Sequence, residues 1–340
     1  MQAGACAAEK RRMIRRIIFF GASLAVLVPA AALPACAGSR SVLRKPGAAY
    51  RRVAVTFDDL PAPSDGVVSY SPAALRAMTA RLLGALERNR IPAIGFVNEE
   101  KLHRGEFSAR VQLLKMWLDA GFSLGNHTYS HVDIDTTPLP AYEADFLRGE
   151  QVTQALLRAR GLREKYFRYP FLDVGKTPAT KRAFEKFLAA HGYHVAPVTI
   201  DNEEYMFAAV YAHAVSTGDT VLAERVVRSF LKYMNDVFAY FESASRELLG
   251  YEPAQVLLLH ADLLDTDEMN ALARLMRARA YHFVSLDAAL RDPAYRQPDN
   301  YVDGGGVSWI EHWADTQHKS LPSGPDVPKY IQEIYTKDSL

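Results

Sequence analysis

The chain has 340 residues, of which 49% are hydrophobic and 23% charged, and it contains 20 glycines and 18 prolines. This is the composition of an ordinary globular protein, so it excludes collagen-like, intrinsically disordered and disulfide-scaffold proteins. The 40 basic residues nearly balance the 39 acidic ones. No overall field therefore attracts the chain to nucleic acid or anionic lipid, and we expect no nucleic-acid partner.

The first 36 residues have the layout of an export signal. Five basic residues come before an uncharged run from Ile17 to Leu33, and a positive segment followed by an apolar one is typical of a secretory signal peptide. A transmembrane anchor is the alternative, but the run is at the short limit for a span and is interrupted by Gly21 and Pro29. We therefore expect an exported protein, periplasmic or attached to the cell envelope.

The end of this signal leaves two ways of processing open. The segment from Leu33 to Gly38 is similar to a bacterial lipobox, in which Cys36 would become the lipid-bearing first residue. The segment Ala35-Cys36-Ala37 could also serve a general signal peptidase. A lipid anchor to the membrane at Cys36 and plain cleavage therefore remain alternatives. Residues 37–50 would form a tether in either case.

Beyond this tether, short apolar segments alternate with amphipathic ones, which is the pattern of repeated β-α units. Ser71 followed by Pro72 is typical of a helix start, because serine caps the helix and proline suits its first turn. The pattern predicts about seven units, with strands at 53–57, 93–97, 122–124, 166–168, 194–198, 256–259 and 282–284 and helices at 75–86, 111–120, 147–159 and 181–190.

Two segments depart from this repeat. A long helical insertion is expected at about Val221–Leu249, and the tail from Pro298 to Leu340 is rich in Gly, Pro and Trp. No Pro/Gly/Ser-rich linker divides the rest of the chain. We therefore expect one domain at 51–297 and a C-terminal extension at 298–340 that packs on it.

Polar residues occur where most of the expected strands end. If the strands are parallel and form a barrel, these ends share one face, and that face carries the chemistry in such folds. The residues are Asp58, Asp59, His127, His131, Arg168, Asp201 and His260. Asp262 also follows a strand closely, and we expect it to be a solvated loop carboxylate.

One carboxylate and two imidazoles with open positions are the ligand set of a catalytic metal centre. The same set also suits non-haem iron oxygenases, so the ligands alone do not choose the reaction. A second carboxylate that can act as a base on metal-bound water, and a separate histidine that can act as an acid, favour hydrolysis.

Five motifs occur in the order typical of one known family. They are Thr56-Phe57-Asp58-Asp59, His127-Thr128-Tyr129-Ser130-His131, Arg168-Tyr169-Pro170-Phe171, Asp201-Asn202-Glu203-Glu204-Tyr205 and Leu258-Leu259-His260. From about residue 51 to residue 290, the chain resembles the polysaccharide deacetylases with a NodB-homology domain, carbohydrate esterase family four.

This resemblance implies a role for each motif residue. Asp59, His127 and His131 would bind the metal. Asp58 would be the catalytic base, Arg168 would hold that base as a carboxylate, Asp201 would orient the catalytic histidine, and His260 would be the general acid.

The resemblance also implies a distorted (β/α) barrel and a metal-dependent hydrolase that removes N-acetyl groups from an amino-sugar polysaccharide or oligosaccharide. The expected cofactor is a divalent metal, Zn²⁺ first, with Co²⁺, Ni²⁺ or Mn²⁺ as alternatives. The expected partner is an acetylated carbohydrate substrate, and we expect a monomer.

Three positions depart from the family pattern. Leu60-Pro61 replaces the glycine that usually follows the Asp pair, so the loop beside the metal must take a different path. Phe171 stands where Tyr is common, and Glu204-Tyr205 stands where Asp-Trp is usual. Phe171 and Tyr205 are candidate substrate-binding residues.

Two other functions remain open. The same metal site could serve an O-acetyl esterase or another amide hydrolase. The protein could also be an inactive, surface-tethered carbohydrate-binding protein, although a chain without catalysis has no need to keep both a base and an acid.

Overall fold

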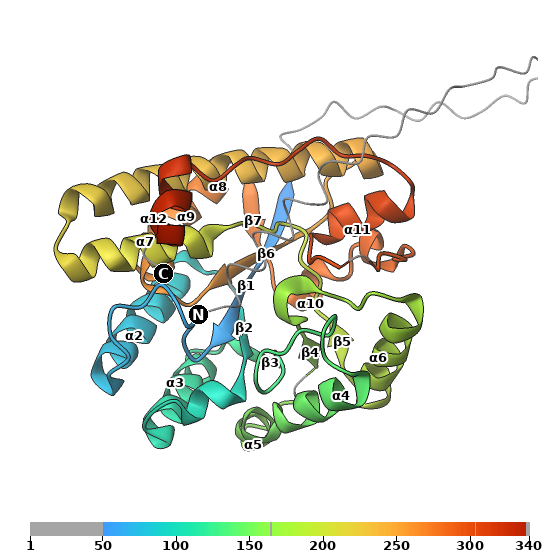
Figure 1. The fold of residues 1–340 in the computed structure, drawn as a ribbon, viewed down its shortest axis with the longest axis horizontal. Coiled ribbons are helices and arrows are strands. Elements are labelled where there is room, and N and C mark those ends of the chain that lie inside the picture. The colour runs from blue at the N-terminus through green and yellow to red at the C-terminus, as the bar shows by residue number, and fades with distance from the viewer. Residues whose placement is uncertain (1–49, 164, 303, 338–340) are drawn as a thin grey trace, which may run out of the picture.

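The computed structural model describes residues 50–163, 165–302 and 304–337. The expected signal peptide at 1–36, with Cys36, and the tether up to residue 49 lie outside the described residues. The described chain is built around one sheet in which every strand pairing is parallel (Figure 1). The predicted α/β class is therefore confirmed.

The central strand is β1 (Arg51–Leu60), which is buried without interruption from residue 53 to residue 58. In a parallel sheet, helices cover both faces, so a central strand has a nearly continuous apolar sequence. Val53-Ala54-Val55-Thr56-Phe57 has this character. The sheet order is β5-β4-β3-β2-β1-β6, and β7 pairs with the start of β1. The other strands are β2 (Ile94–Val97), β3 (Ser123–Asn126), β4 (Tyr166–Phe167), β5 (His194–Val195), β6 (Gln255–His260) and β7 (Tyr281–Phe283).

The sheet curls into a ring beyond β5. There the chain runs on to Ile200, which forms an isolated parallel bridge with Leu257 on the outer edge of β6. The N–H of Ile200 donates to the carbonyl of Val256 at 2.9 Å, and the N–H of Leu258 donates to the carbonyl of Ile200 at 3.2 Å. Among the residues that the structure describes, one short bridge closes the ring, and the curled parallel sheet confirms the distorted (β/α) barrel.

Helices follow the strands along the chain and cover the outside of the sheet. They are α2 (Pro72–Asn89), α3 (Phe107–Asp119), α4 (Leu139–Arg148), α5 (Gln151–Arg158), α6 (Pro178–Ala190), α9 (Leu263–Ala278) and α10 (Leu286–Ala289). The first of them begins as expected, because the Ser71 side chain accepts from the N–H of Ala74 and Pro72 occupies the first turn.

The helix expected at 147–159 is two helices, α4 and α5, and Gly149 follows the first of them. A Cβ at Gly149 would lie 2.6 Å from the backbone of Thr128 and Tyr129. Such an approach is possible only without a side chain. The break between α4 and α5 therefore lets this turn press against the loop that carries His127 and His131.

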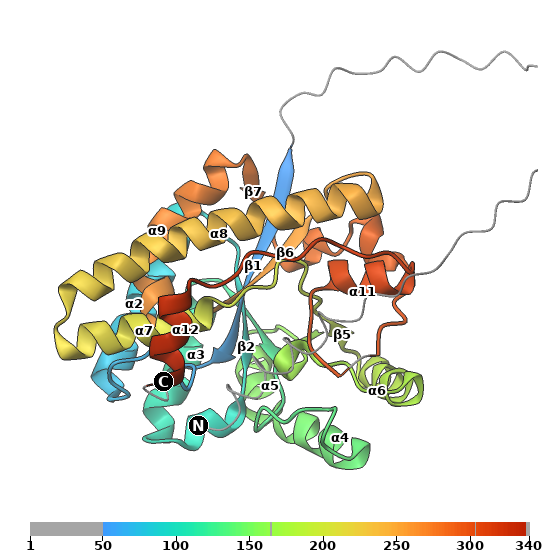
Figure 2. The ribbon, with the colours of Figure 1, turned by 45° about the horizontal axis from the view of Figure 1, so that its top comes forward.

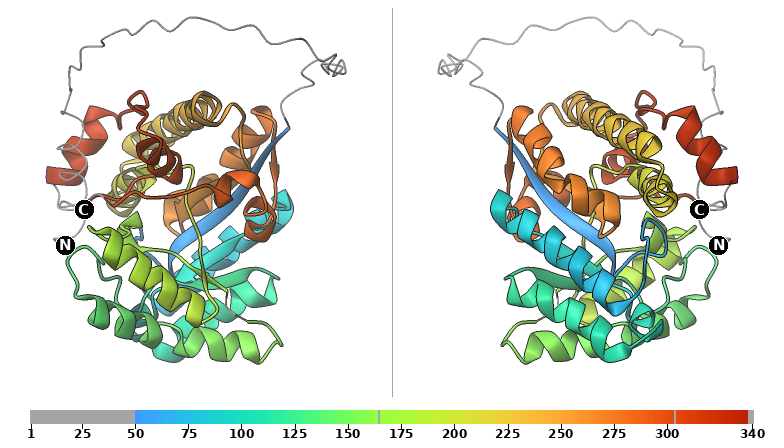
Figure 3. Two further views of the ribbon diagram at one scale, coloured as in Figure 1. Left: turned by 90° about the vertical axis from the view of Figure 1, so that its right-hand side faces the viewer. Right: turned by 90° about the vertical axis from the view of Figure 1, so that its left-hand side faces the viewer.

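The expected insertion is α8 (Thr220–Leu249), which forms a long hairpin with α7 (Glu204–Thr217). Two helices of the tail, α11 (Trp309–Thr316) and α12 (Lys329–Lys337), pack on α8 and α7 respectively. Figure 2 shows α12 lying across α7. In both views of Figure 3, β1 runs diagonally, the yellow-orange α8 lies in the upper part of the molecule and the teal and green helices α3–α5 lie in the lower part.

Within the described ranges, none of the helices combines the length and the apolar character that a membrane span requires.

Candidate active site

The two carboxylates of the first motif lie at the end of β1. In a regular strand, successive side chains point to opposite faces. Here Asp59 has φ of 70°, and the register with β2 shifts between Phe57 and Leu60. Such a bulge re-aims a side chain, and both carboxylates reach His127: its Nε2 lies 3.9 Å from Oδ2 of Asp58 and 3.8 Å from Oδ1 of Asp59.

The two histidines of the second motif lie on a loop after β3, not on a helix. Thr128 and His131 have φ of 61° and 58°. Side chains support this turn, because the N–H of Thr128 donates to Oδ1 of Asn126 at 2.8 Å and the N–H of His131 donates to Oγ1 of Thr128 at 3.1 Å. The result is two imidazole rings with centroids 4.9 Å apart.

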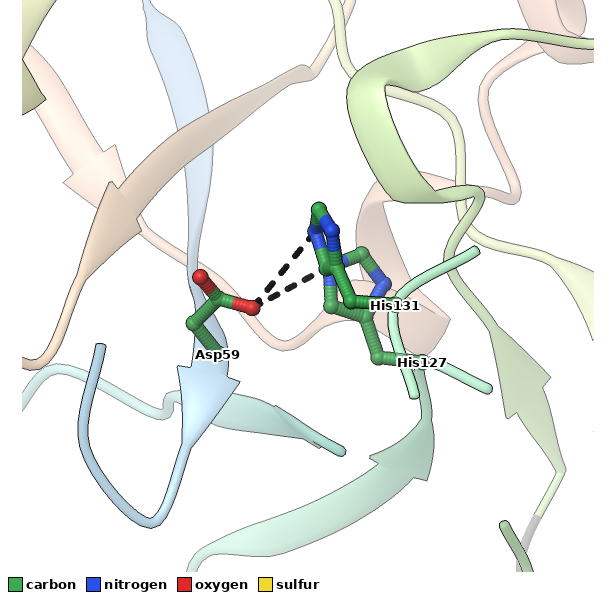
Figure 4. Close-up of side chains that lie close together, drawn as sticks. All are labelled: Asp59, His127 and His131. Atoms are coloured by element: carbon green, nitrogen blue, oxygen red, sulfur yellow. Dashed lines mark ion pairs between the residues drawn. The ribbon is translucent and has the colours of Figure 1, made fainter. Parts of the chain in front are cut away.

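Asp59, His127 and His131 form a group that fits a divalent metal (Figure 4). One ligand atom of each lies within 4.8 Å of the others, and Oδ1 of Asp59 is 3.6 Å from Nε2 of His131. The carbonyl of Arg168 lies 2.8 Å from Nδ1 of His127. A carbonyl only accepts, so Nδ1 carries the proton and the Nε2 lone pair faces Asp59.

The protonation of this group also suits metal binding. Burial lowers the pKa of His127 well below its usual value and that of His131 to about 4. Both rings are therefore neutral, as metal ligands must be. Burial would raise the pKa of the Asp59 carboxyl, but Lys101 and then the two histidines hold it well below its usual range.

Lys101 is a member of this cluster that we did not predict. It lies in the short helix η1 (Glu99–His103), which follows β2, and it is 4% exposed. Its Nζ is 2.9 Å from Oδ1 of Asp59, the oxygen that faces both histidines. Its position in the sequence could have indicated this role. Lys101 comes four residues after the expected strand at 93–97, and we assigned no polar residue to the end of that strand.

Arg168 contacts Asp58, the residue that the family resemblance assigns to it. Nη1 of the buried Arg168 donates to both oxygens of Asp58 at 3.1 Å, and Nη2 donates to the hydroxyl of Thr56 at 3.0 Å. Its neighbours Phe167 and Tyr169 contact the ring of Phe184 with centroids 5.3 and 5.6 Å apart. These aromatic contacts fix the position of the segment that carries Arg168.

The environment of Asp58 brings its pKa toward neutrality. Burial raises the pKa of this carboxyl, and Arg168 and His260 oppose the shift, so that the result is about 6. A base with this pKa is a carboxylate at neutral pH and still accepts a proton readily.

His260 is the direct register partner of Asp58, since β1 and β6 pair these two residues. The carboxylate at its Nδ1 is that of Glu204, with Oε1 at 2.9 Å, and the N–H of His260 also donates to Oε1 at 2.8 Å. Burial would lower the pKa of His260, but Glu204, followed by Asp59 and Asp58, raises it to about 10.

The prediction that Asp201 orients His260 is therefore corrected to Glu204. Oδ1 of Asp201 accepts from the N–H of Asn202 at 2.9 Å. The side chain of Asn202 donates to the carbonyl of Leu258 and accepts from the N–H of Glu204. This bridge fixes the start of α7 against β6 and brings Glu204 to the histidine. The charge of Asp201 acts on Arg168 instead. Burial lowers the pKa of Arg168, and the charges of Asp58 and Asp201 oppose that shift.

Asp262 was expected in solvent, but it is 1% exposed and caps α9 by accepting from the N–H of Asp265 at 2.8 Å. Carboxylate oxygens of Glu204, Asp262 and Asp265 lie within 4.8 Å of one another. Burial raises the pKa of Asp262 and Asp265 well above the usual value. A buried group of acids therefore lies behind Glu204, and the sequence did not reveal it.

The two candidate substrate-binding residues lie at different places. Phe171, in the short helix η2 (Pro170–Leu172), packs edge-on against His131 with ring centroids 4.4 Å apart. Tyr205 follows Glu204, and its ring contacts that of Tyr335 in α12 at 5.9 Å. Phe171 has φ of 58°, like Asp59, Thr128 and His131. Strained backbone of this kind concentrates at functional sites.

Residues 46–195 match the family model described as polysaccharide deacetylase. A chitin deacetylase of Colletotrichum lindemuthianum is 28% identical over 156 residues, which are 45% of this chain and 52% of that protein. The chain thus spans about half the length of this curated relative.

Two solved structures are similar at a lower level. A family 4 carbohydrate esterase from Streptomyces lividans in complex with acetate is 22% identical, with a TM-score of 0.43 over 71% of this chain and 97% of that one. A carbohydrate esterase family 4 pseudoenzyme from Bacillus anthracis is 13% identical, with a TM-score of 0.44 over 72% of this chain and 66% of that one.

The matched segment contains the first three motifs, and their side chains meet at one end of the sheet. Over residues 46–195, this chain is therefore similar to the polysaccharide deacetylase family.

Proposed function

We propose that the protein is a metal-dependent hydrolase that removes N-acetyl groups from an amino-sugar polysaccharide or oligosaccharide. One observation supports this most strongly. A buried carboxylate, Asp58, and a histidine with a raised pKa, His260, are register partners on neighbouring strands and adjoin the group Asp59, His127 and His131. Amide hydrolysis needs a base for water and an acid for the departing amine.

Asp59, His127 and His131 would hold the metal, which we propose is Zn²⁺, with Co²⁺, Ni²⁺ or Mn²⁺ as alternatives. Neutral imidazoles and a carboxylate are typical catalytic zinc ligands. When bound, a divalent metal lowers the pKa of a coordinated water and polarises a carbonyl oxygen. His127 is already oriented for this by its Nδ1–H bond to the carbonyl of Arg168.

In this reaction, Asp58 accepts a proton from the attacking water, whose oxygen bonds to the acetamide carbon. Arg168 keeps Asp58 charged and fixes both of its oxygens. His260 donates its proton to the amide nitrogen as the C–N bond breaks, and Glu204 holds the imidazolium in place. The products are acetate and a free amino sugar.

Acetate release tests the proposal. Protein loaded with Zn²⁺ and incubated with N-acetylglucosamine oligomers should release acetate, and EDTA or Asp59→Ala should abolish this release. Asp236→Ala is the matched control, because Asp236 lies on α8 in an exposed pair with Lys232. Undiminished release from Asp59→Ala would refute the metal assignment. Release from acetyl esters alone, retained in His260→Ala, would favour an O-acetyl esterase instead.

From the sequence, we further propose that residues 1–36 direct export to the periplasm or envelope, that Cys36 could carry lipid, and that the protein is a monomer. Cell fractionation of the full chain and of Cys36→Ser tests the anchor. Membrane attachment that is lost in the variant supports lipidation, and release of both forms as soluble protein supports plain cleavage.

A further inference from the structure

The C-terminal extension contacts the candidate site on two sides. After Tyr301, the tail passes the third motif, and the N–H of Trp309 at the start of α11 donates to the carbonyl of Val198 at 2.7 Å. The tail then crosses to α12, which packs on α7. In Figures 1 and 2, α11 and α12 lie on opposite sides of the central strands.

On the side of the metal ligands, the tail presses against Phe171. A Cβ at Gly306 would lie 1.6 Å from the carbonyl oxygen of Phe171, so the two backbones are in direct contact. Phe171 in turn packs its ring on His131. The hydroxyl of Tyr301 donates to the carbonyl of Gly305 at 2.6 Å and holds this turn. The tail thus supports a wall immediately beside a metal ligand.

On the side of the acid, α12 forms a second wall. Tyr335 packs on Tyr205, the residue after Glu204. The helix is well anchored, because Ile331 is fully buried and the hydroxyl of Tyr330 donates to Ser229 at 2.9 Å. The guanidinium of Arg225 also lies 3.7 Å from the ring centre of Tyr330.

The loop between β1 and α2 lies on a third side of the site, between α7 and η1. At Gly66, a Cβ would lie 3.0 Å from the Cβ atoms of Ala208 and Asp262, so the loop packs closely on α7 and the start of α9. At Ser64, the hydroxyl accepts from Arg104 at 3.2 Å, just after η1. The loop therefore lies against α7, the start of α9 and the residue that follows η1.

We propose that the tail, α12 and the loop 61–71 form walls on three sides of the site, so that the protein deacetylates a chain end or a short oligosaccharide and not the interior of a long polymer. This inference rests on the proposed function. An interior unit of a polysaccharide needs an open path on both sides of the reacting sugar. Phe171 and Gly306 adjoin the metal-ligand side of the site, and Tyr335 packs on Tyr205, the residue after Glu204, on the acid side. In the proposed arrangement these residues close the two paths.

A chain-length series tests the inference with the unmodified protein. N-acetylglucosamine oligomers from the dimer to the hexamer, and long soluble partly acetylated polymer, would be incubated at equal acetyl concentration, and the products sequenced by mass spectrometry. We expect one terminal acetyl group to be lost per oligomer, and a rate per acetyl group that falls with length. Removal of interior acetyl groups at equal rates would overturn the inference. No release from any of these substrates would instead contradict the proposed function.

Point variants test which wall is responsible. Tyr335→Ala should open the acid side and raise the ratio of hexamer to dimer kcat/KM about tenfold. Tyr330→Phe is the matched control: it lies on the same helix, loses only the hydroxyl contacts with Ser229 and the carbonyl of Arg225, and should leave the ratio unchanged. An unchanged ratio in folded Tyr335→Ala would overturn the role of α12. Circular dichroism and metal content show whether each variant is folded.

Discussion

Asp58 and His260 are register partners on β1 and β6, yet their surroundings favour opposite charges at neutral pH, negative on Asp58 and positive on His260. The side chain of Asp58 is 4% exposed, and burial outweighs its cationic partner Arg168, so its pKa rises to about 6. The side chain of His260 is 19% exposed, and the Glu204 carboxylate outweighs burial, so its pKa rises to about 10. Two neighbouring groups whose pKa values are set apart by their surroundings can serve as base and acid at the same pH.

The largest expected effect follows from removing the proposed base. Asp58→Asn keeps the shape of the side chain but accepts no proton, so acetate release should fall about 10³- to 10⁴-fold. Zinc content, measured by mass spectrometry, should stay at the wild-type level because Asp59, His127 and His131 remain. A decrease below about tenfold would show that another group takes the proton.

The corresponding change on the acid side is Glu204→Gln. The amide does not stabilise the imidazolium, so the pKa of His260 should fall, kcat should drop about 10²-fold, and activity should be lost at a lower pH than in the wild type. Asp201→Asn is the comparison variant, because the carboxylate in contact with His260 is that of Glu204. An alkaline limb that moves more in Asp201→Asn than in Glu204→Gln would show that Asp201, and not Glu204, sets the pKa of His260.

The pH dependence of the wild type tests both groups together. In the proposed reaction Asp58 is deprotonated and His260 is protonated. On the acid side, kcat/KM should therefore rise with pH and level off above about 6. On the alkaline side, activity should decline again as the pH rises through about 10. Outside these limits, the rate should change about tenfold per pH unit. A profile with no acidic limb would exclude Asp58 as the base.

The smallest effect concerns Lys101, whose ammonium faces the ligand oxygen of Asp59 at 2.9 Å. A cation in this place competes with a metal for the same oxygen, so Lys101→Met should raise the affinity for Zn²⁺ about five- to tenfold. Competition with a chromophoric chelator measures this. Methionine fills a similar volume, so the fold should be kept. Weaker zinc binding in the variant would mean that Lys101 helps to hold the site together.

The sequence predicted most of the site because its motifs are local and their places in the fold follow from strand order. Parallel strands end at one edge, so Asp58, His127, Arg168 and His260 meet once the β-α repeat is recognised. Glu204 was seen in the sequence but given no role at the histidine. Its reach depends on the turn at Asn202, which a side-chain bridge to Leu258 sets. A hydrogen bond of this kind leaves no periodic pattern in the sequence.

By itself, the sequence determined the class of the fold, the order of its strands along the chain and the residues that end them, because hydrophobic periodicity and turn residues are local properties. Only the tertiary structure decided the short bridge at Ile200 that closes the ring, the bulge that aims Asp59, the placing of Lys101 beside it and the contact of Tyr335 with Tyr205. Each of these depends on segments far apart in the chain, and packing alone brings such segments together.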